Sequence, residues 1–240
     1  MDDPIIEFSS VTESFRRMRR HYGLKATFLH PFQFLKERGE VCEFKVLDDV
    51  SFSIKKGERV GIVGHNGCGK TTALSIIGGV YKRCRGTMNV RGRVAMMLAL
   101  GAGFNSQLSG RDNIMLNGVL QGKTKHEMRE LMQDVIDFAD IGEFIDSPLY
   151  QYSSGMLARI GFGVATAINP DILLVDEVMA VGDADFRKKC DVRMRDLLAA
   201  GVTLILVSHN PQDIRKHCNR VIKLEHGRVI YDGPVDGDWI

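Results

Sequence analysis

Long apolar runs are missing from this chain of 240 residues. No run reaches the roughly 18 residues that a membrane-spanning helix needs, so the sequence predicts no such helix. The opening residues, "MDDPIIEF", are acidic and lack the basic segment of a secretory signal. Lys and Arg total 32 against 30 Asp and Glu. This near balance does not indicate a nucleic-acid-binding protein.

Cysteine is also scarce, with five residues and no CxxC pair. An odd number without paired spacing favours reduced thiols in a cytosolic protein over a disulfide framework or a metal site. Cys68 lies in a glycine-rich segment, and we expect its thiol to react with a maleimide unless a bound nucleotide protects it. The other four are expected to be small buried hydrophobic residues: Cys42, Cys84, Cys190 and Cys218.

Apolar residues are plentiful, at 44% of the chain, which is enough for one sizeable α/β core. "DILLVDE" and "VTLILVSH" have the length and β-branched content of strands buried on both faces of a parallel sheet. We expect helices across residues 70–80 and 111–140, and a crossover helix capped by Gly201. "TMNVRGRVAMML" predicts a pair of short strands, and "RVIKLEHGRVIYDG" predicts a hairpin that turns at "HG".

The segment "GHNGCGKT" fits the phosphate-loop pattern G-x-x-x-x-G-K-[ST] and follows an apolar strand. Its glycines let backbone N–H groups approach phosphate oxygens, and the next helix adds the positive end of its dipole. Lys70 is expected to reach the β- and γ-phosphates, and the Thr71 hydroxyl to bind Mg²⁺. The nucleotide-binding residues expected here are Gly64, His65, Asn66, Gly67, Cys68, Gly69, Lys70, Thr71 and Thr72.

Two further strands deliver polar residues to the edge of the sheet where ligands bind in such folds. "ILLVDE" ends in Asp176, expected to hold Mg²⁺, and in Glu177, expected to accept a proton from the attacking water. "LILVSHN" places His209 where it can reach the γ-phosphate. The catalytic residues predicted are therefore Lys70, Asp176, Glu177 and His209.

The segment "YSSGM" stands just before a predicted helix. Ser153, Ser154 and Gly155 offer a hydroxyl and free N–H groups at a helix N-terminus, which is an anion site. A Ser N-cap with no ligand explains the same residues and would be the default in isolation.

Together these segments resemble, in order, the ATP-binding cassette of ABC transporters. The resemblance implies an α/β P-loop fold with a mostly parallel core sheet, an antiparallel β subdomain and an inserted α-helical subdomain. It implies ATP and Mg²⁺ as cofactors and a homodimer, in which Ser153 and Gly155 bind the nucleotide of the other subunit. It also makes Asp183 in "AVGD" the D-loop aspartate, Glu177 the catalytic base and His209 the switch histidine.

Three segments look like those of ATPase subunits that export O-antigen, capsule and teichoic-acid polysaccharides. They are "YSSGM", "DEVMAVGDADFRKKC" and "LGAGFNSQLSGRDNI". The insertion with "HPFQFLKERG" looks like that group too. The resemblance implies ATP hydrolysis that drives export of a lipid-linked glycan through separate transmembrane permease subunits. The chain would then be peripheral, on the cytoplasmic face of the bacterial inner membrane, and would bind no nucleic acid.

The same resemblance divides the chain, treated as one ABC ATPase domain over residues 1–240. A RecA-like core is expected at 1–100 and 165–240, a basic insertion at about 12–45 and a helical subdomain at about 101–164, with no C-terminal carbohydrate-binding domain. The insertion, with its cluster of arginines at 16–20, is either a solvated charged face or a contact with the membrane or permease.

Two residues that ABC cassettes usually carry have no matching residue at the expected position of this sequence. The usual Q-loop glutamine falls near Leu100, and the adenine-stacking aromatic falls near Val41, which leaves Phe44, Phe34 or Tyr22. Three alternatives stay open: a soluble ABC ATPase, the ATPase of an importer or drug exporter, and a P-loop enzyme such as a small-molecule kinase. The first usually carries two cassettes or a long coiled coil, the second should show "LSGGQ", and the third lacks "YSSGM" and His209.

Overall fold

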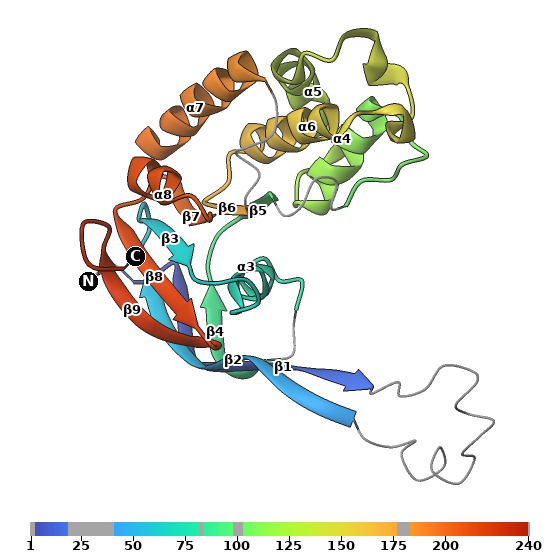
Figure 1. Ribbon diagram of the computed structural model, residues 1–240. Helices are drawn as coiled ribbons and strands as arrows, with labels where there is room; N and C mark the ends of the chain where they lie inside the picture. Colours follow the sequence, from blue (N-terminus) through green and yellow to red (C-terminus); the bar gives the residue numbers. More distant parts are fainter. Residues whose placement is uncertain (1–2, 19–40, 82–83, 98–102, 177–182, 240) are drawn as a thin grey trace, which may run out of the picture.

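The computed structural model describes residues 3–18, 41–81, 84–97, 103–176 and 183–239. Within them the chain forms two sheets and a lobe of helices (Figure 1). The strands are β1 (Ile6–Met18), β2 (Val41–Ile54), β3 (Arg59–Val63), β4 (Arg85–Val90), β5 (Val94–Met97), β6 (Ile172–Asp176), β7 (Thr203–Val207), β8 (Arg220–Glu225) and β9 (Arg228–Pro234). The helices are α3 (Lys70–Ile77), α4 (Gly110–Leu120), α5 (Lys125–Ala139), α6 (Ser154–Ala167), α7 (Ala184–Ala199) and α8 (Pro211–His217), with short 3₁₀ turns at Gly142–Asp146 and Leu149–Gln151.

The larger sheet has the strand order β5-β6-β7-β3-β8-β9, and its neighbours are parallel except for β8 and β9. Its central strands are buried on both faces because successive side chains enter different cores. In β6, Ile172 and Leu174 face the core that α3 fills, whereas Leu173 and Val175 face the core shared with α6, α7 and α8. The sheet therefore lies between α3 on one face and these three helices on the other.

The smaller sheet has the order β2-β1-β4 and is antiparallel. Its inner face joins the core of α3, and there Phe8 and Phe52 stack with ring centroids 4.5 Å apart. β1 and β2 stay paired out to Met18 and Val41. The ends of the expected insertion are thus strands, while Arg19, Arg20, Tyr22 and Phe34 lie outside the described residues.

The helical lobe contains α4, α5 and α6 (Figure 1). The single helix expected across residues 111–140 is wrong, because the chain breaks at Gly122, whose φ is +90°. Thr124 then starts α5 with a capping box, in which its hydroxyl accepts from the Glu127 N–H and its own N–H donates to the Glu127 carboxylate. α5 buries Met128, Val135 and Phe138 at helical spacing.

Three other boundaries differ from expectation. α3 ends at Ile77 rather than at residue 80, because Gly79 has a φ of +74°. The C-cap of α7 is Ala200, and Gly201, at φ +85°, is the left-handed residue after it. β4 and β5 are both strands, as expected, but they belong to different sheets.

The last hairpin is confirmed: β8 and β9 turn at His226 and Gly227, whose φ angles are +48° and +77°. Among the described residues, no helix has both the length and the apolar composition to cross a bilayer.

Candidate functional site

The glycine-rich loop joins the carboxyl end of β3 to α3. Gly64, Gly67 and Gly69 have φ angles of +145°, +80° and +108°, which only glycine adopts readily. A Cβ on Gly64 would collide with the Leu224 carbonyl, and one on Gly69 would lie 2.8 Å from the Val46 carbonyl. Gly69 provides no side-chain cap for α3, so the first N–H groups of the helix are open to an anion.

Lys70 places its ammonium group over this loop. Its Nζ donates to the carbonyl oxygens of Gly64 and His65, at 2.9 Å each, and the residue is 7% exposed. The side chain is thus folded back across the loop from the start of α3. Positive charge and open N–H groups then face the same space, as a polyphosphate requires.

The rest of the loop varies in exposure. His65 and Asn66 are exposed and Thr72 is half-buried. The His65 ring lies 5.3 Å from that of His226 in the β8–β9 turn. Cys68 is 1% exposed and packs in the core beside α3. The expectation of a reagent-accessible thiol is therefore wrong, because the loop turns this side chain inward.

Thr71 and Asp176 meet across the sheet edge, which joins two segments that are 105 residues apart. The Thr71 hydroxyl donates to Asp176 Oδ2 at 2.9 Å. A hydroxyl and a carboxylate oxygen in contact are ligands that Mg²⁺ prefers. The donor set present here therefore fits the ion that the sequence predicts.

His209 comes two residues after β7 ends, and β7 lies between β6 and β3 in the sheet. The parallel strands bring His209, Asp176 and the phosphate loop to the same edge. His209 is exposed there. Glu177, which follows Asp176 directly, lies outside the described residues.

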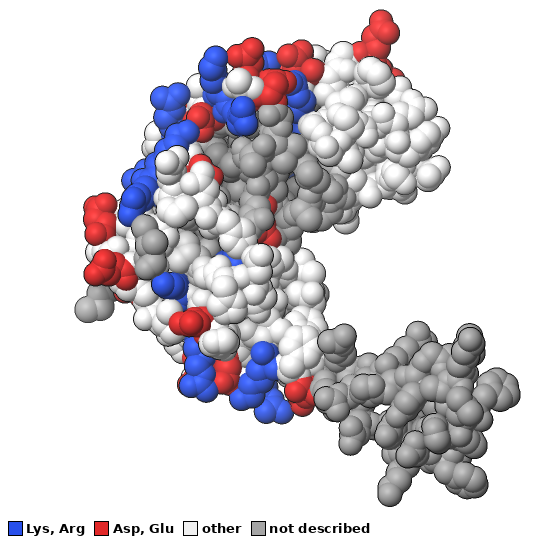
Figure 2. All heavy atoms as spheres, viewed as in Figure 1, with Lys and Arg blue, Asp and Glu red and all other residues white. Residues whose placement is uncertain are grey.

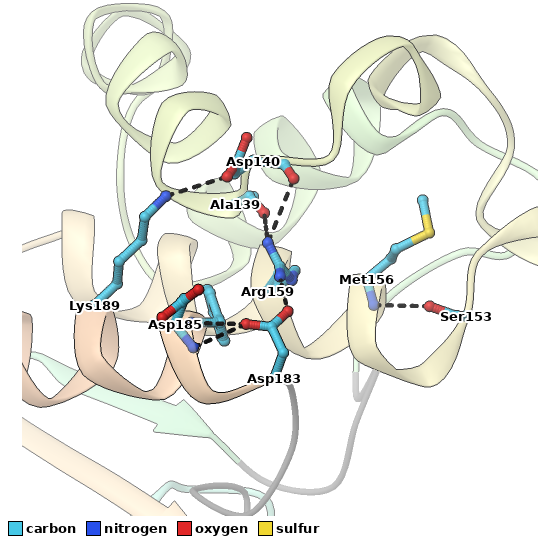
Figure 3. Close-up of polar contacts among 9 residues, drawn as sticks. Ala139, Asp140, Ser153, Met156, Arg159, Asp183, Asp185 and Lys189 are labelled. Atoms are coloured by element: carbon cyan, nitrogen blue, oxygen red, sulfur yellow. Dashed lines mark hydrogen bonds and ion pairs between the residues drawn. The ribbon is translucent and has the colours of Figure 1, made fainter.

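The "YSSGM" segment lies in the helical lobe. Ser153 is the N-cap of α6, and its Oγ accepts from the Met156 N–H at 3.2 Å (Figure 3). Ser153 and Ser154 are exposed, and Gly155 is half-buried. α6 and α3 cover opposite faces of the larger sheet. Within one chain, the start of α6 therefore does not join the phosphate loop.

Asp183 caps α7 at its N-terminus. Its Oδ1 accepts from the N–H groups of Asp185, at 3.1 Å, and Phe186, at 2.8 Å. Its Oδ2 accepts from Arg159 Nη2 at 2.6 Å. The Phe186 N–H and the Arg159 guanidinium lower the pKa of the Asp183 carboxyl, and partial desolvation opposes them. Both carboxylate oxygens are thus engaged within the chain.

An aromatic cluster lies at the end of the smaller sheet, and it joins Phe44, one of the expected candidates, to Phe15 and Tyr81, which the sequence analysis missed. Phe15 is paired with Phe44 across β1 and β2, with ring centroids 6.1 Å apart, and Tyr81, beyond α3, meets Phe15 edge-on at 5.5 Å. Phe44 and Tyr81 are 49% and 38% exposed. Phe44 comes two residues before Val46, whose carbonyl abuts Gly69. The sequence signal for Phe15 was the alternation of apolar and polar residues along β1, which continues to this residue.

Comparison with known proteins gives a consistent result. The family that matches residues 47–180 is described as ABC transporter. The O-antigen export system ATP-binding protein RfbB of Klebsiella pneumoniae is 46% identical, with 94% of this chain and 92% of that protein covered. The teichoic acids export ATP-binding protein TagH of Bacillus anthracis is 38% identical, with 96% of this chain but 41% of that protein covered.

Solved structures resemble the fold. A dimeric ATP-binding cassette in a post-hydrolysis state, bound to ADP and phosphate, superposes with a TM-score of 0.74 at 22% identity. The superposition covers 97% of this chain and 99% of that one. At this identity the likeness concerns the fold, an α/β cassette with a mostly parallel sheet and an antiparallel one.

The burial of Cys68 predicts that a maleimide leaves it unmodified in the folded chain. Labelling should require unfolding, with or without nucleotide, because the thiol has no path to solvent. Mass spectrometry of peptides after brief labelling measures this, with urea-unfolded protein as the positive control. Rapid stoichiometric modification of Cys68 in the native protein would contradict the packing described here.

The exposed aromatic cluster predicts a stacking surface for the nucleotide base. Phe15→Ala should weaken ATP binding by roughly tenfold, since stacking on an aromatic is worth about 1–3 kcal/mol. Phe8→Leu, in the buried part of the same strand, is the control and should leave affinity unchanged. Titration with a fluorescent ATP analogue measures both, and equal affinities for Phe15→Ala and wild type would remove Phe15 from the site.

Proposed function

Because this chain belongs to the ABC transporter family of ATP-binding subunits, we propose that it hydrolyses ATP to drive export of a lipid-linked polysaccharide. The observation that carries the ATPase part is the Thr71–Asp176 contact beside the Lys70 ammonium. Relatives named for O-antigen and teichoic-acid export support the cargo class across most of the chain's length.

Phosphate binding is assigned to the loop Gly64–Lys70 and to the start of α3. Lys70 exchanges its two carbonyl partners for β- and γ-phosphate oxygens, which are stronger acceptors because they are charged. Thr71 and Asp176 would hold Mg²⁺, which neutralises phosphate charge when bound. Phe44, which is exposed, and Phe15, which is half-buried, would offer their ring surfaces to adenine.

The separation of α6 and α3 supports a dimer as the working unit. Ser153, Ser154 and Gly155 stand at an exposed helix N-terminus, which attracts an anion. Because they lie away from their own loop, we assign them to the γ-phosphate held by a second copy. Two copies facing each other would then enclose two nucleotides, each bound by the loop of one subunit and by α6 of the other.

Hydrolysis is assigned to the edge of the larger sheet. Glu177 accepts a proton from the attacking water, and His209 donates a hydrogen bond to the γ-phosphate. Asp183 follows Glu177 by six residues in the sequence. We assign it to the dimer contact near the nucleotide. Loss of the γ-phosphate removes the attraction for the partner's α6, so the dimer opens.

Coupling to a permease is assigned to the helical lobe, at about residues 101–164. Its loops 103–109 and 148–150 lie side by side, since the Leu149 and Tyr150 N–H groups donate to Leu108 and Ser106 carbonyls. Phe144 and Tyr150 are 50% and 62% exposed there. Figure 2 shows one face of the helical lobe with few charged side chains. Such a face suits a transmembrane partner at the cytoplasmic side of the inner membrane.

The base assignment predicts the behaviour of Glu177→Gln. This variant should bind ATP as tightly as wild type and hydrolyse it at least ~100-fold more slowly, because general base catalysis contributes about 10²–10⁴-fold. It should also accumulate as a dimer with ATP, which size-exclusion chromatography with light scattering detects. A Glu177→Gln protein that turns over normally would refute the assignment.

The cargo is tested in the source cell. Replacing the gene with its Glu177→Gln form should remove surface polysaccharide and cause lipid-linked glycan to accumulate inside, since assembly continues while export stops. Surface extraction and analysis of the lipid-linked fraction measure both. An unchanged surface with normal intracellular glycan would refute polysaccharide export while leaving the ATPase in place.

A further inference from the structure

Arg159 joins three helix ends at one point of the molecule (Figure 3). It lies on α6, less than two turns after the N-cap Ser153. Its Nη1 donates to the carbonyl of Ala139 at 3.1 Å and to that of Asp140 at 3.4 Å, both at the end of α5. Its Nη2 donates to Asp183 Oδ2 at 2.6 Å, at the start of α7.

The guanidinium is held independently of Asp183. The last carbonyls of a helix lack partners within it, so a cation at the end of α5 meets both open acceptors and the negative end of the dipole. The ring of Phe186 lies beneath the guanidinium, 4.7 Å from its carbon to the ring centroid. The Arg159 side chain is 18% exposed. It is therefore a fixed donor, and Asp183, at 60% exposure of its side chain, is the more accessible partner.

Asp183 passes this position on to α7. Through Oδ1 it accepts from N–H groups in the first turn of that helix. The proposed function assigns Asp183 to the dimer contact near the nucleotide. A group that fixes Asp183 therefore fixes both the start of α7 and that contact.

We propose that Arg159 is a positioning residue that holds Asp183 at a fixed place relative to the N-terminus of α6. The inference rests on the proposed function, in which that N-terminus binds the γ-phosphate of the second copy and Asp183 belongs to the dimer contact. Because Arg159 lies on α6 itself, the contact of Ser153 with this phosphate and the dimer contact of Asp183 are made together. Both contacts then contribute to the closed dimer in which ATP is hydrolysed.

Arg193 provides a matched control. Its guanidinium also joins α7 to α5, through two bonds to the Asp134 carboxylate at 2.9 and 3.2 Å. It also lies over a phenylalanine, 5.1 Å from the Phe138 centroid, and its side chain is 29% exposed. Among the described residues, its hydrogen bonds and its ring contact involve α5 and neither α6 nor Asp183. It repeats the interhelical bridge without the proposed coupling.

The experiment compares Arg159→Gln, Arg159→Lys and Arg193→Gln in the full chain. ATP affinity, kcat at saturating ATP, thermal midpoint and ATP-dependent dimer formation in the Glu177→Gln background are measured for each. Arg159→Gln should lose roughly tenfold or more in kcat and lose the trapped dimer, with ATP affinity within about twofold of wild type. Arg193→Gln should match wild type in kcat, whatever its thermal midpoint.

Arg159→Lys keeps the charge but offers a single ammonium, which does not reproduce the planar fork that spans Ala139 and Asp183. It should therefore also lose kcat, and it carries the test if the Gln variant does not fold. Asp183→Asn added to Arg159→Gln should cost little more than Arg159→Gln alone, because both changes break the same contact.

Wild-type kcat in both Arg159 variants, or an equal loss in Arg193→Gln, would overturn the proposal. Equal losses would mean that any bridge between α5 and α7 serves, and that Arg159 is structural. Failure of the proposed function looks different: the wild-type chain itself would then not hydrolyse ATP, or its Glu177→Gln form would not dimerise.

Discussion

The site depends on three adjacent parallel strands whose faces are both covered. β6, β7 and β3 are buried almost throughout, so their register is fixed by two cores at once. Each strand ends at the same edge, and each is followed there by a polar segment: Asp176, His209 and the glycine-rich loop. The Thr71–Asp176 hydrogen bond is a consequence of this arrangement, since neither residue could find the other without the sheet between them. Burial of apolar side chains thus sets the geometry of a polar site.

Much of this could be predicted from the sequence because the signals are local. The glycine pattern, the lysine and the threonine occupy one short segment, and the two buried strands are continuous apolar runs. The ends of the helices were harder to predict from the sequence. Gly79 and Gly122 end helices through positive φ angles, and apolar periodicity alone does not reveal which glycine in a segment takes that conformation.

Contacts between distant segments could be predicted only where both segments carry a motif, as Thr71 and Asp176 do. Phe15 and Tyr81 come together only because β1 and α3 pack in one core, and counting along the insertion led to Val41 and its neighbours instead. Cys68 looked exposed because it stands in a phosphate loop, yet the turn at Gly64 directs its side chain inward. Arg159 lies outside the "YSSGM" segment, and its partners Ala139 and Asp183 are 20 and 24 residues away, so the sequence does not reveal its contacts.

The division of the site between two faces of the sheet explains how nucleotide could do mechanical work. A chain that held every phosphate ligand by itself would bind ATP equally well in any arrangement of its subunits, and equal affinity shifts no equilibrium. In the proposed dimer, with α6 on one side and the loop on the other, the full set of ligands exists only when two copies meet. ATP would then favour the closed dimer by the free energy of the contacts made at α6. The proposed role of Arg159 adds a condition of timing. Asp183 would be placed by the same helix that binds the phosphate, so ATP would be hydrolysed after closure and not before it.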